Sequence, residues 1–312
     1  MEHSDNKVMV SDENFPVLKR KNLKLDIHKI NSTYPKPKKL KKLSISPSKD
    51  QLSFGLEYAV SSKKGNSRKD MQDHYKVNSH PEFTSYGVYD GHHSSHASTF
   101  AADWLQYCLR SHNDTDIINA FQYTDTTYLN NFPESRSGTT ASVLMVSDTH
   151  IISANVGDSP VLLVRENDFK VLSCNHNTEN KSERSRIEKL GGFVLPVGKT
   201  LRVQGSLKLT RSIGDQPYKE LLSPFPHIEV EERSSQDLFG VVSSDGLIEG
   251  MSYQEVADFV KNNRNKPLSE IAESLTDLAL EKSRDNATVI IVDLKQNNKL
   301  MSTRNSARRF TF

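Results

Sequence analysis

The chain has 312 residues, a modest hydrophobic content of 35%, a mean hydropathy of -0.61 and a formal net charge of +2. No apolar stretch approaches the ~20 residues that a membrane-spanning helix needs, and the N-terminus lacks the apolar core of a signal peptide. The two cysteines, Cys108 and Cys174, have neither a disulfide framework nor a metal-binding spacing, which favours a reducing, intracellular compartment.

Charge divides the chain into three parts. Residues 1–50 carry 12 lysines and arginines against six acids, and residues 296–312 carry four basic residues and no acid. Residues 51–295 therefore have a net charge of −8, which argues against a broad nucleic-acid-binding surface on this part. We expect one globular domain over 51–295, preceded by a basic, largely disordered tail at 1–50 and followed by a basic tail at 296–312.

Strands rich in Val, Ile, Tyr and Thr and amphipathic helices fill the expected domain. Order is expected to begin near 52–60. The predicted elements in chain order are strands Tyr75–Asn78 and Ser85–Tyr89, helices 96–112 and 115–132, strands Thr140–Val146, Ile151–Val156, Val161–Val164 and Lys170–Ser173, a helix at 179–190, a strand Gly240–Ser243, helices 252–262 and 267–283, and a strand Ala287–Asp293. Helices come in pairs between strand hairpins, which favours an α+β domain with antiparallel sheets and helices packed outside.

Local signals mark several helix ends. Gly191-Gly192 is typical of a helix C-terminus, and Ser252 and Glu255 have the spacing of a capping box. Pro267 suits the first turn of the last helix.

Four aspartates stand at the edges of β-type runs: Asp73, Asp90, Asp245 and Asp285. Carboxylates that converge from strand ends repel one another unless a cation lies between them, and Mg²⁺ or Mn²⁺ suits an all-oxygen shell. The pattern predicts a two-metal hydrolytic centre with Arg68 and His92 beside it. Read singly, Asp90-Gly91 and Asn155-Val-Gly157-Asp158 are ordinary tight turns.

Residues 53–295 resemble the metal-dependent type 2C Ser/Thr protein phosphatases, including plant-type members. The matching stretches are Arg68-Lys-Asp-Met-Gln-Asp73, Tyr89-Asp-Gly-His92, Ser137-Gly-Thr-Thr-Ala141, Asn155-Val-Gly-Asp-Ser159, Glu183-Arg-Ser-Arg-Ile187 with Gly191-Gly192, Arg202 to Arg211, Gly214-Asp215, Ser243-Ser-Asp-Gly-Leu247 with Met251 to Val256, and Arg284-Asp-Asn286. Each stretch is weak by itself, whereas nine in register are highly specific. The resemblance implies a four-layer α-β-β-α sandwich, in which two central antiparallel sheets are flanked by pairs of helices.

The resemblance also implies a metal site. Two Mg²⁺ or Mn²⁺ ions are expected on five groups: Asp73, Asp90, the Gly91 carbonyl, Asp245 and Asp285. Asp158 matches a position that, together with Asp245, helps to hold a third, weaker ion in many members.

The implied reaction is hydrolysis of phosphoserine or phosphothreonine by a water that the two ions share and acidify. Arg68 matches the arginine that binds phosphate, and its guanidinium fits two phosphate oxygens. His92 matches the general acid that protonates the leaving alkoxide, and no covalent phosphoenzyme is needed.

Several residues depart from the family pattern. Gln72 stands where many relatives have Glu, His93-Ser94 replaces a pair of glycines, and Pro160 replaces an arginine. None removes an expected direct metal ligand. The sequence therefore favours an active enzyme. The alternative is a catalytically weak or inactive pseudophosphatase that acts as a phosphoprotein-binding module.

The N-terminal tail contains a basic cluster, Lys36-Pro-Lys-Lys-Leu-Lys-Lys, followed by Leu43 and Ile45. Leu23 and Leu25 follow a second basic run. This form resembles the docking motif by which proteins bind MAP kinases, because lysines suit an acidic patch and alternate apolar residues suit a groove. A nuclear localisation signal and a solvated tail remain open. We expect a monomer in the cytoplasm or nucleus that acts on a phosphoprotein, without nucleic acid or membrane partners.

Overall fold

The computed structural model describes residues 56–295, so the expected tails at 1–50 and 296–312 lie outside the described residues. A five-stranded sheet has the order β1 (Tyr58–Lys63), β14 (Ala287–Asp293), β13 (Asp237–Ser243), β7 (Val161–Arg165) and β8 (Phe169–Val171). A seven-stranded sheet has the order β11 (Ile213–Gly214), β4 (Gly138–Thr139), β3 (Phe83–His92), β5 (Ala141–Ser147), β6 (His150–Val156) and β12 (His227–Glu232), with β2 (Asp73–Ser79) also paired to β3. A separate hairpin joins β9 (Val194–Val197) and β10 (Thr200–Val203), and all named strand pairs are antiparallel.

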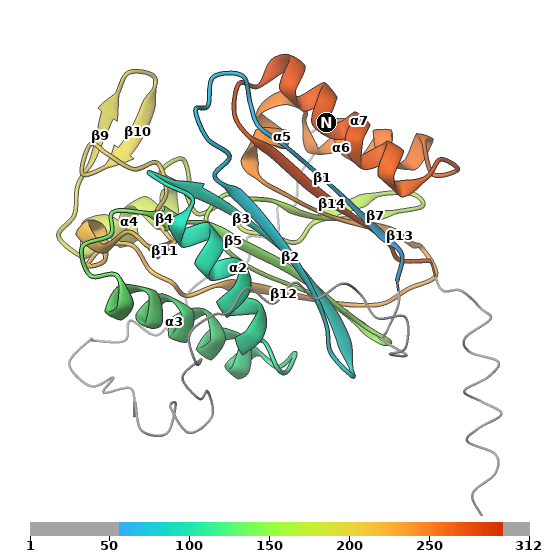
Figure 1. Ribbon diagram of the computed structural model, residues 1–312, viewed down its shortest axis with the longest axis horizontal. Coiled ribbons are helices and arrows are strands. Elements are labelled where there is room, and N and C mark those ends of the chain that lie inside the picture. The colour runs from blue at the N-terminus through green and yellow to red at the C-terminus, as the bar shows by residue number, and fades with distance from the viewer. Residues whose placement is uncertain (1–55, 296–312) are drawn as a thin grey trace, which may run out of the picture. The chain divides into compact units, whose positions relative to one another are not determined.

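Helices form the outer layers (Figure 1). Helices α2 (His96–Cys108) and α3 (Asp114–Asn131) lie on the seven-stranded sheet. Helices α5 (Asp245–Gly250), α6 (Tyr253–Asn262) and α7 (Leu268–Lys282) cover the five-stranded sheet. The α+β sandwich that the sequence predicted is therefore confirmed. Within residues 56–295, no helix has the length and apolarity that crossing a bilayer requires.

Successive residues of the central strands face opposite layers, which is why the strand at the end of the domain is continuously apolar. On β14, Ile290 and Val292 pack between the two sheets, whereas Val289 and Ile291 pack under the helices. All four are fully buried. Burial of one such side chain contributes roughly 1.5–3 kcal/mol, so β14 anchors both cores and holds the loop before it in place.

Each predicted strand overlaps an observed one, and the five predicted helices are present. The capping box is formed, with the Ser252 and Glu255 side chains each accepting from the other's backbone N–H. Gly191 has a φ of +82° just after α4 (Lys181–Lys189), as a helix-ending glycine should. The helix predicted at 96–112 ends earlier, at Cys108.

Several short elements were not predicted. Strand β1 was expected only as the beginning of order, and strands β9–β12, the two-residue β4 and the six-residue α5 were missing from the expected set. Such elements are too short to show a period, and β12 reads His-Ile-Glu-Val-Glu-Glu, which has more acid than a typical strand. A short 3₁₀ turn at Gln216–Tyr218 was also missed.

Helix α4 and the β9–β10 hairpin share a small core of their own that includes Ile187, Val203 and Leu222. On the same helix, buried Glu183 accepts hydrogen bonds from Arg186 and Arg211. Burial acts to raise the pKa of Glu183, but the two guanidinium groups outweigh burial and lower the pKa to about 2. This carboxylate therefore stays charged and ties α4 to the segment before β11.

Ion pairs link one edge of each sheet. Lys170 on edge strand β8 lies 2.6 Å from both Glu229 and Glu231 on edge strand β12. Arg165, at the end of β7, contacts Glu231 at 2.6 Å and buried Asp237 at 3.0 Å. The two sheets are thus joined at this side by charged groups rather than by strand pairing.

Candidate active site

Both sheets contribute aspartates to one cluster. Asp73 is the first residue of β2 and pairs in register with Asp90 of β3. Asp245 follows β13, and Asp285 lies just before β14, the strand next to β13. The structure therefore brings together the four aspartates that the sequence singled out. Asp245 is also the first residue of helix α5, a short helix that the sequence analysis did not predict.

The clustered carboxylates destabilise one another when charged. Burial, together with the charges of Asp73 and Asp245, raises the pKa of Asp90 well above its ordinary value. Burial raises the pKa of Asp245 to about 8, with the Asp158 charge adding to the shift, and burial raises the pKa of Asp73 to about 6. Interaction between the Asp90 and Asp245 side chains also raises the pKa of Asp90, because two carboxyl groups this close are more stable when they share a proton. A bound cation would take the place of that proton.

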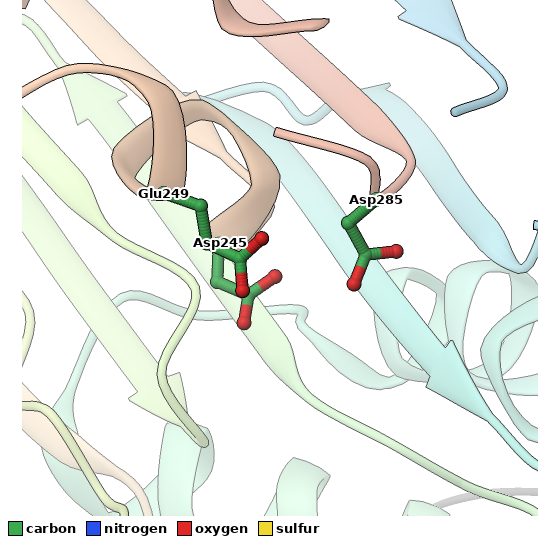
Figure 2. Close-up of side chains that lie close together, drawn as sticks. All are labelled: Asp245, Glu249 and Asp285. Carbon is green, nitrogen blue, oxygen red and sulfur yellow. The ribbon is translucent and has the colours of Figure 1, made fainter. Parts of the chain in front are cut away.

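Glu249 joins the cluster and was not predicted. Side-chain oxygens of Asp245, Glu249 and Asp285 lie within 4.8 Å of one another. In Figure 2, Asp245 and Glu249 stand together on α5, and Asp285 faces them from the loop before β14. The spacing of four residues places both acids on one helix face, so predicting α5 would have revealed Glu249. Its Oε2 accepts a hydrogen bond from the Ser283 hydroxyl at 2.9 Å.

Arg68 lies beside the cluster and binds Asp285. Its Nε donates to Asp285 Oδ1 at 2.6 Å, and its Nη2 pairs with Oδ2 of the same carboxylate. The hydrogen bonds to Asp285 are the main reason why the pKa of Arg68 is raised. The Arg68 side chain is 47% exposed, so this bidentate ion pair is accessible to solvent.

His92 is held by a buried carboxylate that the sequence analysis quoted without a role. His92 Nε2 lies 2.6 Å from Asp215 Oδ1, and the Ser212 hydroxyl donates to Oδ2 at 2.6 Å. Burial acts to raise the pKa of Asp215, but the His92 ring and the Ser212 hydroxyl outweigh it and hold the pKa below its ordinary value. Gly138 makes room for this group, since a Cβ there would lie 2.1 Å from Asp215 Oδ2.

Replacing Asp215 with Asn is expected to lower kcat by about 10- to 100-fold and to leave KM nearly unchanged, because Asp215 positions His92 without reaching substrate. Steady-state kinetics of the Asp215→Asn variant measures kcat and KM separately. An unchanged kcat, or a loss confined to KM, would contradict the positioning role.

Asp158 lies apart from the tight group of acids. It follows β6 in the turn before β7, and its Oδ2 lies 3.6 Å from Lys208 Nζ and 3.3 Å from Asn177 Nδ2. Its charge still reaches Asp245, whose pKa it helps to raise. Lys208 and Asn177 were not predicted as partners, because nothing in the local sequence connects three separate segments.

Position 91 has no room for a side chain, so close packing requires glycine there, apart from any role of its carbonyl as a metal ligand. A Cβ on Gly91 would lie 2.6 Å from the Ser98 hydroxyl and 2.7 Å from the Gln72 carbonyl oxygen. That carbonyl accepts from both Ser98 Oγ and Gly91 N–H, which ties helix α2 to β3. The backbone carbonyl of Gln72 therefore helps to hold Gly91 in place.

His93 occupies a conformation that favours glycine. Its φ is +63°, while neighbouring Ser94 is not among the described residues with positive φ. A non-glycine residue in this region costs about 1–2 kcal/mol. The departure from the family's glycine therefore places strain directly after the candidate acid His92.

His93→Gly is expected to be more stable than His93→Ala by about 1 kcal/mol, because only glycine accepts this φ without strain. Urea unfolding of both variants measures the difference. Ser94→Gly is the matched control, and it should show no gain because its backbone is not in the left-handed region. Equal stability of the two His93 variants would refute the assignment of strain.

Comparisons with known proteins identify the family of this chain. Residues 58–288 match the sequence profile of the family described as Protein phosphatase 2C. The chain is 31% identical over 271 residues to "Protein phosphatase 2C 50" of Oryza sativa subsp. japonica, a match that covers 69% of this chain and 70% of the relative. It is also 31% identical over 279 residues to "Protein phosphatase 1B" of Mus musculus, which covers 76% and 70%.

A solved structure shows the same fold. The serine-threonine phosphatase 2C from Toxoplasma gondii aligns with a TM-score of 0.68 over 78% of this chain and 96% of its own, at 18% identity. With the profile match spanning the described domain from β1 into β14, the chain belongs to the protein phosphatase 2C family.

Proposed function

We propose that this chain hydrolyses phosphoserine and phosphothreonine in proteins and depends on two bound Mg²⁺ or Mn²⁺ ions. The observation that carries the proposal is the convergence of aspartates from both sheets, of which Asp73 is buried and the other three are partly buried. Asp73 and Asp90 come from one sheet, and Asp245 and Asp285 follow or precede strands of the other.

The donor set fits such ions. Every side chain in the cluster offers carboxylate oxygen, the ligand that Mg²⁺ and Mn²⁺ prefer. Oδ2 of Asp73 is buried and, within residues 56–295, has no hydrogen-bond partner. Burying such an oxygen without a partner is unfavourable, and a cation would satisfy it. Asp73, Asp90, the Gly91 carbonyl, Asp245 and Asp285 are the groups that we assign to hold the ions.

The ions would, when bound, lower the pKa of a water nucleophile and offset charge on the phosphate. The chain's own residues do the rest. The Arg68 guanidinium grips two oxygens of one carboxylate and has the geometry to grip two oxygens of a phosphate in the same way. His92 Nε2 faces Asp215, and residues 56–295 provide no hydrogen-bond partner for Nδ1, so we assign Nδ1 as the atom that delivers a proton to the leaving alkoxide.

The direct test is hydrolysis of a phosphothreonine peptide by the purified chain with Mn²⁺, with Mg²⁺ and with EDTA. We expect turnover with either metal and none with EDTA. Absence of turnover in the folded protein at high Mn²⁺ would refute the enzymatic proposal. The alternative would then be a pseudophosphatase that binds phosphoproteins, and strained His93 would be the first residue to revert to glycine.

For the substrate, we propose a MAP kinase recruited by Lys36–Ile45. The support is sequence alone: clustered lysines followed by Leu43 and Ile45 spaced by one residue, outside the described residues. Replacing Leu43 and Ile45 with Ala should weaken binding of the full chain to a purified MAP kinase. Undiminished binding after Leu23 and Leu25 are replaced as well would refute the docking proposal.

The same lysines support a competing proposal of nuclear import, with the protein in the nucleus and not only in the cytoplasm. Imaging distinguishes the two. Replacing the lysines while keeping Leu43 and Ile45 should empty the nucleus if they form an import signal, whereas the apolar replacements should leave localisation unchanged.

A further inference from the structure

A lysine lies against the one predicted metal-site aspartate that stands apart from the others. The Asp158 side chain is 6% exposed, and Lys208 Nζ lies 3.6 Å from its Oδ2. Asn177 Nδ2 donates to the same oxygen at 3.3 Å. Asp158 therefore already has a positive partner and a hydrogen-bond donor from the chain itself.

The backbone fixes both partners in place. Thr178 N–H donates to the Lys208 carbonyl at 2.9 Å, and Asn177 forms an isolated antiparallel bridge with Leu209. These contacts hold the segment before β11 beside 177–178, so that two side chains from separate segments reach one oxygen. The Lys208 side chain is 36% exposed, so the chain shields most of it from solvent.

The ammonium also lies within the field of the wider acid cluster. The carboxylates of Asp158, Asp245 and Glu249 all interact favourably with the ammonium. A lysine that is paired with a carboxylate and partly open to solvent keeps its ordinary positive charge at neutral pH.

We propose that the Lys208 ammonium is the resident cation of the Asp158 corner and takes the place of the third, weaker divalent ion that the family resemblance assigns to Asp158 and Asp245. The inference builds on the proposed two-metal function and concerns this chain's own charge at one corner of that site. A tethered ammonium is always present, so the corner is neutralised whatever the concentration of free metal. A divalent ion there would meet a like charge within a few ångströms of its ligand, which is unfavourable at low effective dielectric.

The test counts bound Mn²⁺ per chain by equilibrium dialysis up to millimolar metal, independently of activity. Lys208→Met keeps the length of the side chain and removes its charge. We expect Lys208→Met to bind one more Mn²⁺ than the parent chain, and Lys208→Arg to bind the same number as the parent. The additional ion should be lost in the Lys208→Met/Asp158→Asn double variant.

Equal Mn²⁺ numbers for the parent chain and Lys208→Met would overturn the inference. If Lys208→Met does not fold, as judged by circular dichroism, Asp158→Asn in the parent chain decides: an unchanged Mn²⁺ number supports the inference, and loss of one ion overturns it. A parent chain that binds no Mn²⁺ would instead refute the proposed two-metal function. The experiment therefore distinguishes failure of the Lys208 inference from failure of the proposed two-metal function.

Discussion

Replacing Asp245 with Asn is expected to lower kcat/KM on a phosphothreonine peptide by about 1,000-fold, which corresponds to ~4 kcal/mol of lost transition-state stabilisation. The reason is that Asp245 interacts with Asp90, and its carboxylate oxygen lies within 4.8 Å of oxygens of Glu249 and Asp285. Its negative charge would therefore help to hold a cation anywhere in this cluster. The same variant should be more stable than the parent chain in EDTA, because it removes a carboxylate whose pKa burial raises to about 8.

Activity and stability should therefore change in opposite directions. Peptide kinetics and urea unfolding in EDTA measure the two effects on one preparation. Asp277→Asn is the matched control, since it removes the same charge from an exposed site on α7 where the partner is Lys63. It should change neither quantity appreciably. An Asp245→Asn variant that loses both activity and metal-free stability would indicate a structural rather than a metal-binding aspartate.

The metal-free protein is expected to lose stability as the pH rises from about 5 to about 8. Asp73 and Asp245 have folded-state pKa values of about 6 and about 8, above the ordinary aspartate range. Over this window the folded state holds protons that the unfolded state has already lost, so rising pH favours unfolding. Each such proton contributes a slope of about 1.4 kcal/mol per pH unit.

Glu183 does not oppose this trend, because its folded pKa of about 2 lies below that of a free glutamate, and its contribution is lost only at lower pH. Urea unfolding in EDTA across the window measures the slope. Saturating Mn²⁺ should flatten the slope, and Asp245→Asn should reduce it. Metal-free stability that is constant or rises over this range would show that the carboxylates are not crowded in solution.

The layers of the fold and the four aspartates of the cluster were predictable because both depend on strands that the sequence identifies. Apolar runs such as Ala287–Asp293 are long enough to identify a strand, and an acid next to such a run is placed by it. Asp73, Asp90, Asp245 and Asp285 all flank β-type runs, so their convergence follows once the strands are known.

Asp215, Glu249 and Lys208 were not predicted because each acts through a contact that no local pattern reports. Asp215 contacts His92 although the two residues are 123 positions apart in the sequence, and Asp215 has a φ of +55°. Glu249 depends on a helix of six residues, too short to show periodicity. Lys208 reaches Asp158 because Asn177 and Leu209 form a bridge. Long-range pairing of this kind is decided by tertiary structure.

The ion pairs between β8 and β12 have a consequence for how copies of the protein behave in a crowded solution. An open sheet edge offers unpaired N–H and C=O groups to any other chain, and natural proteins commonly protect such edges with charge. Here Lys170 places a positive charge on the β8 edge, and Glu229 and Glu231 place negative charges on the β12 edge. Neutralising Lys170 would leave the β8 edge without its charge and the acidic side chains of β12 without their counter-charge. We expect both edges then to be less protected against pairing with another chain.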